Sequence, residues 1–155
     1  MKLAEALAAR ADTQRRVQQL QRRIANNARY QEGEPPTEDA SALLAEAVEA
    51  CAELEDLIRR INRTNASTRL GTGTVTDALA RRDVLRIRHG LLTAAADAAA
   101  GKDGQGYGRQ LRSELPYVSA LDVRELREQA DRVAREIREV DLAVQRVNWE
   151  AELAD

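Results

Sequence analysis

Seven polar side chains fall on helical faces that are otherwise apolar, and they are the residues of this 155-residue chain best placed to do chemistry. If they are buried between helices, such groups must hydrogen-bond to one another. A network of this kind typically fixes helix register and the choice of partner. The alternative is a small-ligand pocket between helices. The seven residues are Gln14, Gln21, Glu55, Asn62, Asn65, Arg82 and His89.

His89 is the only histidine in the chain, and it shares a helical face with Leu85 and Leu92. This position favours a core-edge histidine that is hydrogen-bonded to a neighbour. The alternative is a metal or small-ligand site in which Asp83 and His89 are the candidate metal ligands. A di-iron bundle needs Glu-x-x-His motifs, but Arg86 stands three residues before His89.

The chain carries no Gly-x-Ser-x-Gly nucleophile elbow and no Gly-Lys-Ser/Thr phosphate-binding motif. We therefore expect no catalytic residues and no cofactor. On these grounds the sequence predicts a protein that is not an enzyme.

The composition indicates which elements position these residues. The chain is rich in Ala, Leu, Glu and Arg, and aromatic residues make up only 3% of it. Such a composition is typical of long packed helices. We expect an all-α fold: an elongated four-helix bundle with coiled-coil-like packing, built as a single domain, 1–155. The predicted helices are 2–30, 40–66, 75–100 and 122–152, with an irregular excursion over 101–121 that could hold a short strand.

The fourth helix shows the clearest pattern, because two apolar rows alternate at spacings of four and three residues. Leu142 and Trp149 lie on the opposite face, seven residues apart. This placement predicts a second buried surface formed by self-association. The alternative is that residues 110–121 fold back over them. The two rows are Leu126, Val133, Val140 and Val147, and Ala130, Ile137, Val144 and Ala151.

The first two helices carry weaker seams. The first seam runs from Leu3 through Gln14, Val17 and Gln21 to Ala28. The second runs through Leu44, Val48, Cys51 and Glu55 to Asn65. This pattern predicts that Cys51 is a small core residue. A single cysteine allows no internal disulfide and suits a reducing, cytoplasmic location.

Charge alternates in sign along the chain. Residues 2–30 carry seven basic and two acidic groups, whereas residues 31–62 carry two basic and nine acidic groups. Opposite signs on successive helices favour helices that attract each other as neighbours. The basic first helix lacks aromatic residues interleaved for base stacking, so nucleic-acid binding is not expected. Membrane binding is not expected either, because the apolar runs are too short for a span.

Four segments of the chain are similar to the septicolysin-like family of small helical bacterial proteins: Asn27–Glu34, Ile61–Asn65, Thr76–Leu85 and Asn148–Trp149. The resemblance implies an all-helical, self-associating protein, such as a hexamer, with no assigned catalytic residues. The family name implies a membrane-active cytolysin.

Together these features favour a non-enzymatic, homo-oligomeric helical protein with a structural or interaction role. Two alternatives stay open. One is a helical bundle that binds a metal or a small ligand at the polar residues around His89. The other is the cytolysin that the resemblance implies.

Overall fold

Four long helices make up most of the chain in a computed structural model that describes residues 1–102 and 115–155. They are α1 (Leu3–Asn27), α2 (Ala40–Ser67), α3 (Val75–Ala99) and α4 (Val123–Glu150). The all-α fold class predicted from the sequence is confirmed, and the helix ends lie within three residues of the predicted ones. The 101–121 excursion falls largely outside the described residues, and 115–121 form neither helix nor strand.

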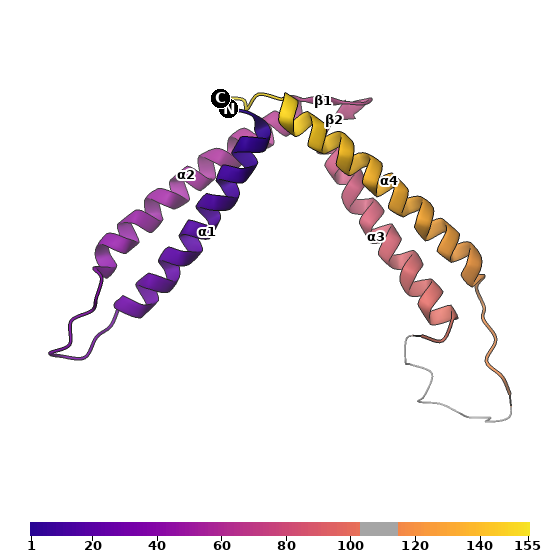
Figure 1. Cartoon of the computed structure of the whole chain (residues 1–155), viewed down its shortest axis with the longest axis horizontal. Helices are drawn as coiled ribbons and strands as arrows, with labels where there is room; N and C mark the ends of the chain where they lie inside the picture. The colour runs from indigo at the N-terminus through magenta and orange to yellow at the C-terminus, as the bar shows by residue number, and fades with distance from the viewer. Residues whose placement is uncertain (103–114) are drawn as a thin grey trace. The chain divides into compact units, whose positions relative to one another are not determined.

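The contacts divide the chain into two compact units. The first unit comprises residues 1–75 and 145–155, and the second comprises residues 76–144. Each unit contains one pair of closely packed helices, which Figure 1 shows side by side. The single domain 1–155 stays a prediction.

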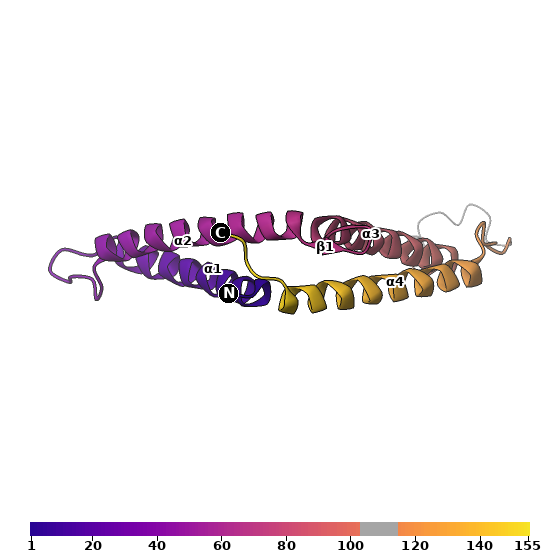
Figure 2. The ribbon, with the colours of Figure 1, turned by 90° about the horizontal axis from the view of Figure 1, so that it is seen from above.

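In the first unit, α1 packs against α2 (Figure 2). Each helix buries a row of residues seven positions apart, as two helices do when they pack along one seam. Arg16 pairs with Glu46 and the later Arg23 pairs with the earlier Glu38, so the two helices are antiparallel. The rows are Ala6, Thr13, Leu20 and Asn27 on α1, and Leu43, Ala50, Leu57 and Thr64 on α2.

A short hairpin follows α2. Its strands, β1 (Arg69–Leu70) and β2 (Gly73–Thr74), pair antiparallel, with Arg69 opposite Thr74 and Leu70 opposite Gly73. Gly71 opens the two-residue turn with a φ of +62°, a conformation that a side chain disfavours. Residues 69–74 therefore form a small β-hairpin that leads into α3.

In the second unit, ion pairs join α3 to α4. Arg81 meets Glu136 at 3.1 Å near the start of α3, and Arg127 meets Asp97 at 2.5 Å near its end. These partners run in opposite directions along the two helices, so the pair is antiparallel. On α4, the two apolar rows predicted from the sequence are buried or half-buried throughout. Asp122 caps α4, because its carboxylate accepts a hydrogen bond from the Glu125 amide at 3.0 Å.

The buried rows of α1 and α2 lie one residue before the seams expected from the sequence. Cys51 is consequently exposed, and the expectation that it is a core residue is wrong. The neighbouring Ala50 takes the core position at 1% exposure. Adjacent apolar residues such as Leu43 and Leu44 satisfy the helical period equally well, so periodicity alone did not decide between the two rows.

Candidate interaction surfaces

The polar residues singled out in the first unit do not form a buried network. Gln14, Gln21, Glu55 and Asn62 are exposed, and Asn65 is half-buried. Over the part of the chain that the structure describes, no hydrogen bond joins any two of them. Their exposure follows from the one-residue shift of the buried rows, which places the expected seams at the edge of the α1–α2 contact.

In the second unit, Arg82 lies between two carboxylates. Its guanidinium is 3.3 Å from Asp83 and 3.5 Å from Asp141, and Arg86 also reaches Asp141 at 3.3 Å. Asp83 is exposed and His89 is half-buried. Within residues 1–102 and 115–155, no three His, Cys, Asp or Glu side chains gather in a way that could hold a metal ion.

The buried polar side chains of the first unit are ones that the sequence interpretation missed. Asn27 lies at the end of α1, and its amide nitrogen donates to the Arg23 carbonyl at 2.8 Å. Its oxygen accepts hydrogen bonds from the Thr37 hydroxyl at 3.2 Å and from the Glu38 amide at 3.1 Å. Asn27 therefore fixes the loop that enters α2. The seven-residue spacing from Leu20 was the signal that could have identified it.

Thr64 has a similar role near the end of α2. Its hydroxyl donates to the Arg60 carbonyl at 2.8 Å and accepts a hydrogen bond from the Ala154 amide at 2.9 Å. The amide of Leu3 donates to the Ala151 carbonyl, and the amide of Leu153 donates to the Met1 carbonyl. The two ends of the described chain are thus joined to each other and to α2.

Ion pairs cover one side of the α1–α2 pair. Arg16 binds Glu46 at 2.8 Å, and Arg23 binds Glu38. The hydrogen bond from Arg23 lowers the pKa of Glu38, and the bond to Glu46 raises the pKa of Arg16. The basic first helix and the acidic second helix are therefore bound neighbours, as the charge alternation predicted. Two arginines of the basic first helix are engaged in this way.

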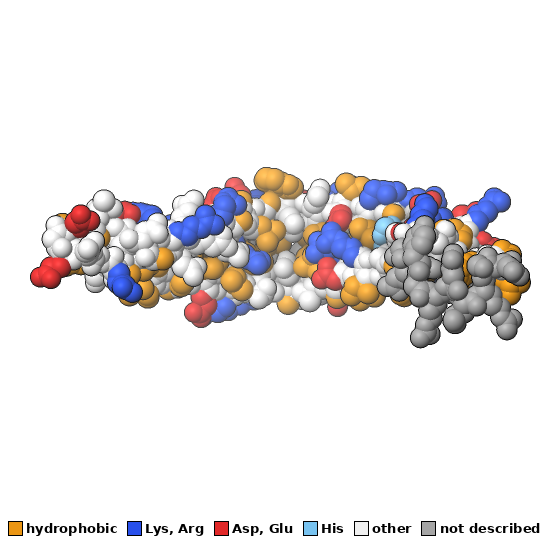
Figure 3. All heavy atoms as spheres, turned by 90° about the horizontal axis from the view of Figure 1, so that it is seen from below, with side chains coloured by type: hydrophobic (Ala, Val, Ile, Leu, Met, Phe, Trp, Pro, Cys, Tyr) orange, Lys and Arg blue, Asp and Glu red, His pale blue; other side chains and the backbone are white. Residues whose placement is uncertain are grey.

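The other side of the α1–α2 pair is an apolar depression, which we call the lateral groove. It has a volume of about 400 Å³. Leu44 and Val48 on its rim are 55% and 63% exposed. Figure 3 shows hydrophobic side chains at the surface in its left half, where α1 and α2 lie. The groove is lined by Val17, Gln21, Ile24, Leu44, Ala47, Val48 and Cys51.

The face of α3 that points away from α4 is also apolar, and we call it the outer seam. Its residues are spaced alternately by four and three, as in a coiled coil. Val84, Ile87 and Leu91 at its centre are 63%, 72% and 68% exposed. The opposite face of α3 is buried, with Leu85 at 7% and Ala96 at 0%. The outer seam consists of Ala80, Val84, Ile87, Leu91, Ala94 and Ala98, all exposed.

Leu142 and Trp149 lie on the exposed face of α4, at 65% and 68% exposure. Both residues therefore lie on the face predicted from the sequence, opposite the two core rows. Within the described ranges, none of the helices is both long and apolar enough to span a bilayer.

Comparisons with known proteins identify relatives but no activity. The model of a family of unknown function, DUF6847, matches residues 10–153. A crystal structure of a functionally unknown conserved protein from Corynebacterium diphtheriae is 40% identical in sequence. The match covers 99% of each chain with a TM-score of 0.90. A comparison with curated proteins found no match.

These matches overturn the resemblance drawn from short segments. The assignment to the septicolysin-like family is wrong, because nothing in the comparisons indicates it and another family model spans nearly the whole chain. The four segments that carried the resemblance were each too short to identify a family. The hexameric state and the cytolysin activity were implied only by that resemblance, so nothing supports them now.

Proposed function

The chain belongs to the DUF6847 family, and we propose that it is a non-enzymatic helical protein that self-associates into a homo-oligomer. In this proposal it has a structural or interaction role and a cytoplasmic location. The single free cysteine, which is exposed, supports a reducing compartment.

The outer seam of α3 is the observation that carries this proposal. Exposed Val84, Ile87 and Leu91 form one continuous apolar strip, and proteins rarely leave such strips in water without a partner. The alternating spacing matches the contact surface of a helix that packs against another helix. Helix α3 therefore has two packing faces, and α4 occupies one of them.

The energetics favour an interface that buries more apolar surface than the outer seam of one copy. Burying one large aliphatic side chain contributes about 1.5–3 kcal/mol. Association costs about 4–15 kcal/mol in lost freedom of motion. Three side chains barely offset that cost, so we expect each contact to bury apolar surface of both copies. Leu142 and Trp149 offer further apolar area of this kind.

Replacing Ile87 by Glu tests the proposal. The side chain is 72% exposed, so the folded subunit tolerates the charge, but an apolar interface does not. We expect Ile87→Glu to weaken association at least tenfold in sedimentation equilibrium while the circular dichroism spectrum stays helical. Tyr30→Glu is the matched control, because Tyr30 is 64% exposed in the loop before α2. A variant at Ile87 that keeps the wild-type mass would contradict the proposed role of the outer seam.

A further inference from the structure

We propose that the lateral groove between α1 and α2 receives the outer seam of α3 from a second copy of this chain. This inference rests on the proposed self-association and assigns the two surfaces that meet. Both surfaces are apolar and exposed, and they lie on different helices of the chain.

The lateral groove has the form of a site for a third helix. It is lined from both helices, by Val17 and Ile24 on α1 and by Leu44, Val48 and Cys51 on α2. The ion pairs of Arg16 and Arg23 lie across the buried rows from the groove, on the other side of the helix pair. The α1–α2 pair thus has one charged side and one apolar side, and the apolar side lacks a covering element among the described residues.

The lateral groove is as long as the central stretch of the outer seam. Leu44 and Cys51 are seven residues apart on α2, and Val84 and Leu91 are seven residues apart on α3. At 1.5 Å per residue, both spans are about 10.5 Å. A helix with apolar residues at alternating spacings of four and three places them into the holes along such a groove.

Charge also favours this pairing. Most charged groups near the two surfaces are already bound within the chain: Arg16 holds Glu46 and Glu53 on the other side of the α1–α2 pair, and Arg81, Arg82 and Arg86 pair with carboxylates of α4. Glu55 beside the groove and Arg88 beside the outer seam form no ion pair with any other residue that the structure describes. Opposite charges at these two positions would guide association and set orientation.

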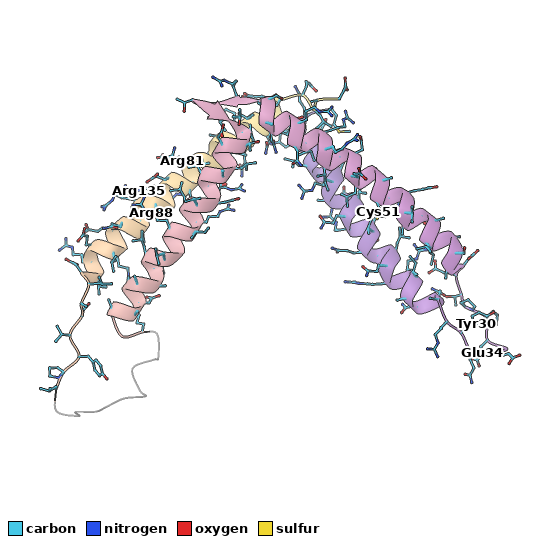
Figure 4. The ribbon with its side chains drawn as sticks, turned by 180° about the vertical axis from the view of Figure 1, so that it is seen from behind. Tyr30, Glu34, Cys51, Arg81, Arg88 and Arg135 are labelled. Carbon is cyan, nitrogen blue, oxygen red and sulfur yellow. The ribbon has the colours of Figure 1, made fainter. Side chains whose placement is uncertain are left out.

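Figure 4 shows where the labelled side chains lie on these elements. Cys51 lies on α2, where it lines the lateral groove, and Arg88 lies on α3, next to the outer seam. A groove and a seam on different parts of one chain form a head-to-tail contact. Such contacts build rings or open chains rather than two-fold dimers.

Mixing two variants tests the pairing. Ile87→Glu disables the outer seam and leaves the groove intact, whereas Val48→Glu disables the groove and leaves the seam intact. Val48 is 63% exposed, so both changes spare the folded subunit. We expect each variant alone to lose at least tenfold in association. An equimolar mixture should form a 1:1 complex of twice the 17.2 kDa chain mass, because one native groove–seam contact is restored. The surfaces left over in that complex are the substituted groove and the substituted seam. A contact between them would place two glutamates against apolar surface, so no third chain adds.

The outcomes separate this inference from the proposed function. If Val48→Glu alone keeps the wild-type mass, self-association stands but the groove is not the receiving surface. If the mixture stays at 17.2 kDa, groove and seam do not pair, and the inference is wrong. If the wild-type chain is itself a monomer, the proposed function fails together with the inference. A mixture of Tyr30→Glu with Ile87→Glu is the control, because the Tyr30→Glu chain retains both the lateral groove and the outer seam.

Discussion

At the scale of single residues, Asn27 combines burial with several side-chain hydrogen bonds. It is 7% exposed and makes three hydrogen bonds that join the end of α1 to the loop before α2. Asn27→Ala should lower the free energy of unfolding by about 1–3 kcal/mol, because three partly buried hydrogen bonds are lost. Urea denaturation measures the change. Asn26→Ala is the control, since Asn26 is exposed, and an equal loss in both variants would contradict the role of Asn27.

Glu152 predicts a dependence of stability on pH. Hydrogen bonds from Lys2 and from the N-terminal amine lower the pKa of its carboxyl group in the folded chain. A lowered pKa stabilises the folded state above the pKa of the unfolded chain, and this gain disappears as pH falls through the folded value. Glu152→Gln should therefore melt at a lower temperature than wild type at pH 7, and the difference should shrink as pH falls below the pKa of an unfolded glutamate, about 4.3.

Differential scanning calorimetry at pH 7 and at pH 3 measures this effect. The ion pair is exposed, so salt should also reduce it. Glu32→Gln is the control, because Glu32 is exposed in the loop before α2 and has no ion pair with a described residue. A difference between Glu152→Gln and wild type that is as large at pH 3 as at pH 7 would count against the contact with Lys2.

At the scale of elements, α4 shows what periodicity can predict. Its core residues are separated mostly by charged ones, so one register fits the pattern best, and the two expected rows are buried or half-buried. Helix ends could also be predicted, because the Gly33–Pro36 segment follows the end of α1 and the capping residue Asp122 precedes the start of α4. Fold class and element order could therefore be predicted from the sequence.

In contrast to α4, helices α1 and α2 have a packing register that could not be predicted from the sequence. Leu43 and Leu44, Ala50 and Cys51 form adjacent pairs in which either member fits the apolar row. The choice between the two members depends on how the facing helix packs, and the apolar pattern of a single helix does not contain that information. Four of the five polar residues expected at these two seams are accordingly exposed, whereas Asn27 and Thr64 are buried.

Helix α3 presents the same ambiguity with a functional consequence. The sequence shows apolar residues around most of its circumference, but it does not show which face meets α4. The structure assigns Leu85 and Ala96 to that contact and leaves Ile87 and Leu91 exposed. The outer seam, and with it the main support for self-association, became visible only when the intramolecular partner was known.

At the scale of the whole molecule, several apolar surfaces lack a cover among the residues that the structure describes. The outer seam, the lateral groove and the Leu142–Trp149 pair all expose large hydrophobic side chains. A partner copy supplies complementary surfaces for a groove and a seam at once, because every chain carries both. This reciprocity is the reason for preferring self-association to binding of an unrelated protein.

The mass of the wild-type chain in solution tests this account most directly. Sedimentation equilibrium from low to high micromolar concentration measures it without any substitution. Self-association predicts a mass that rises with concentration above the 17.2 kDa of one chain, to at least twice that value. A mass that stays at 17.2 kDa up to high micromolar concentration would contradict the proposed function.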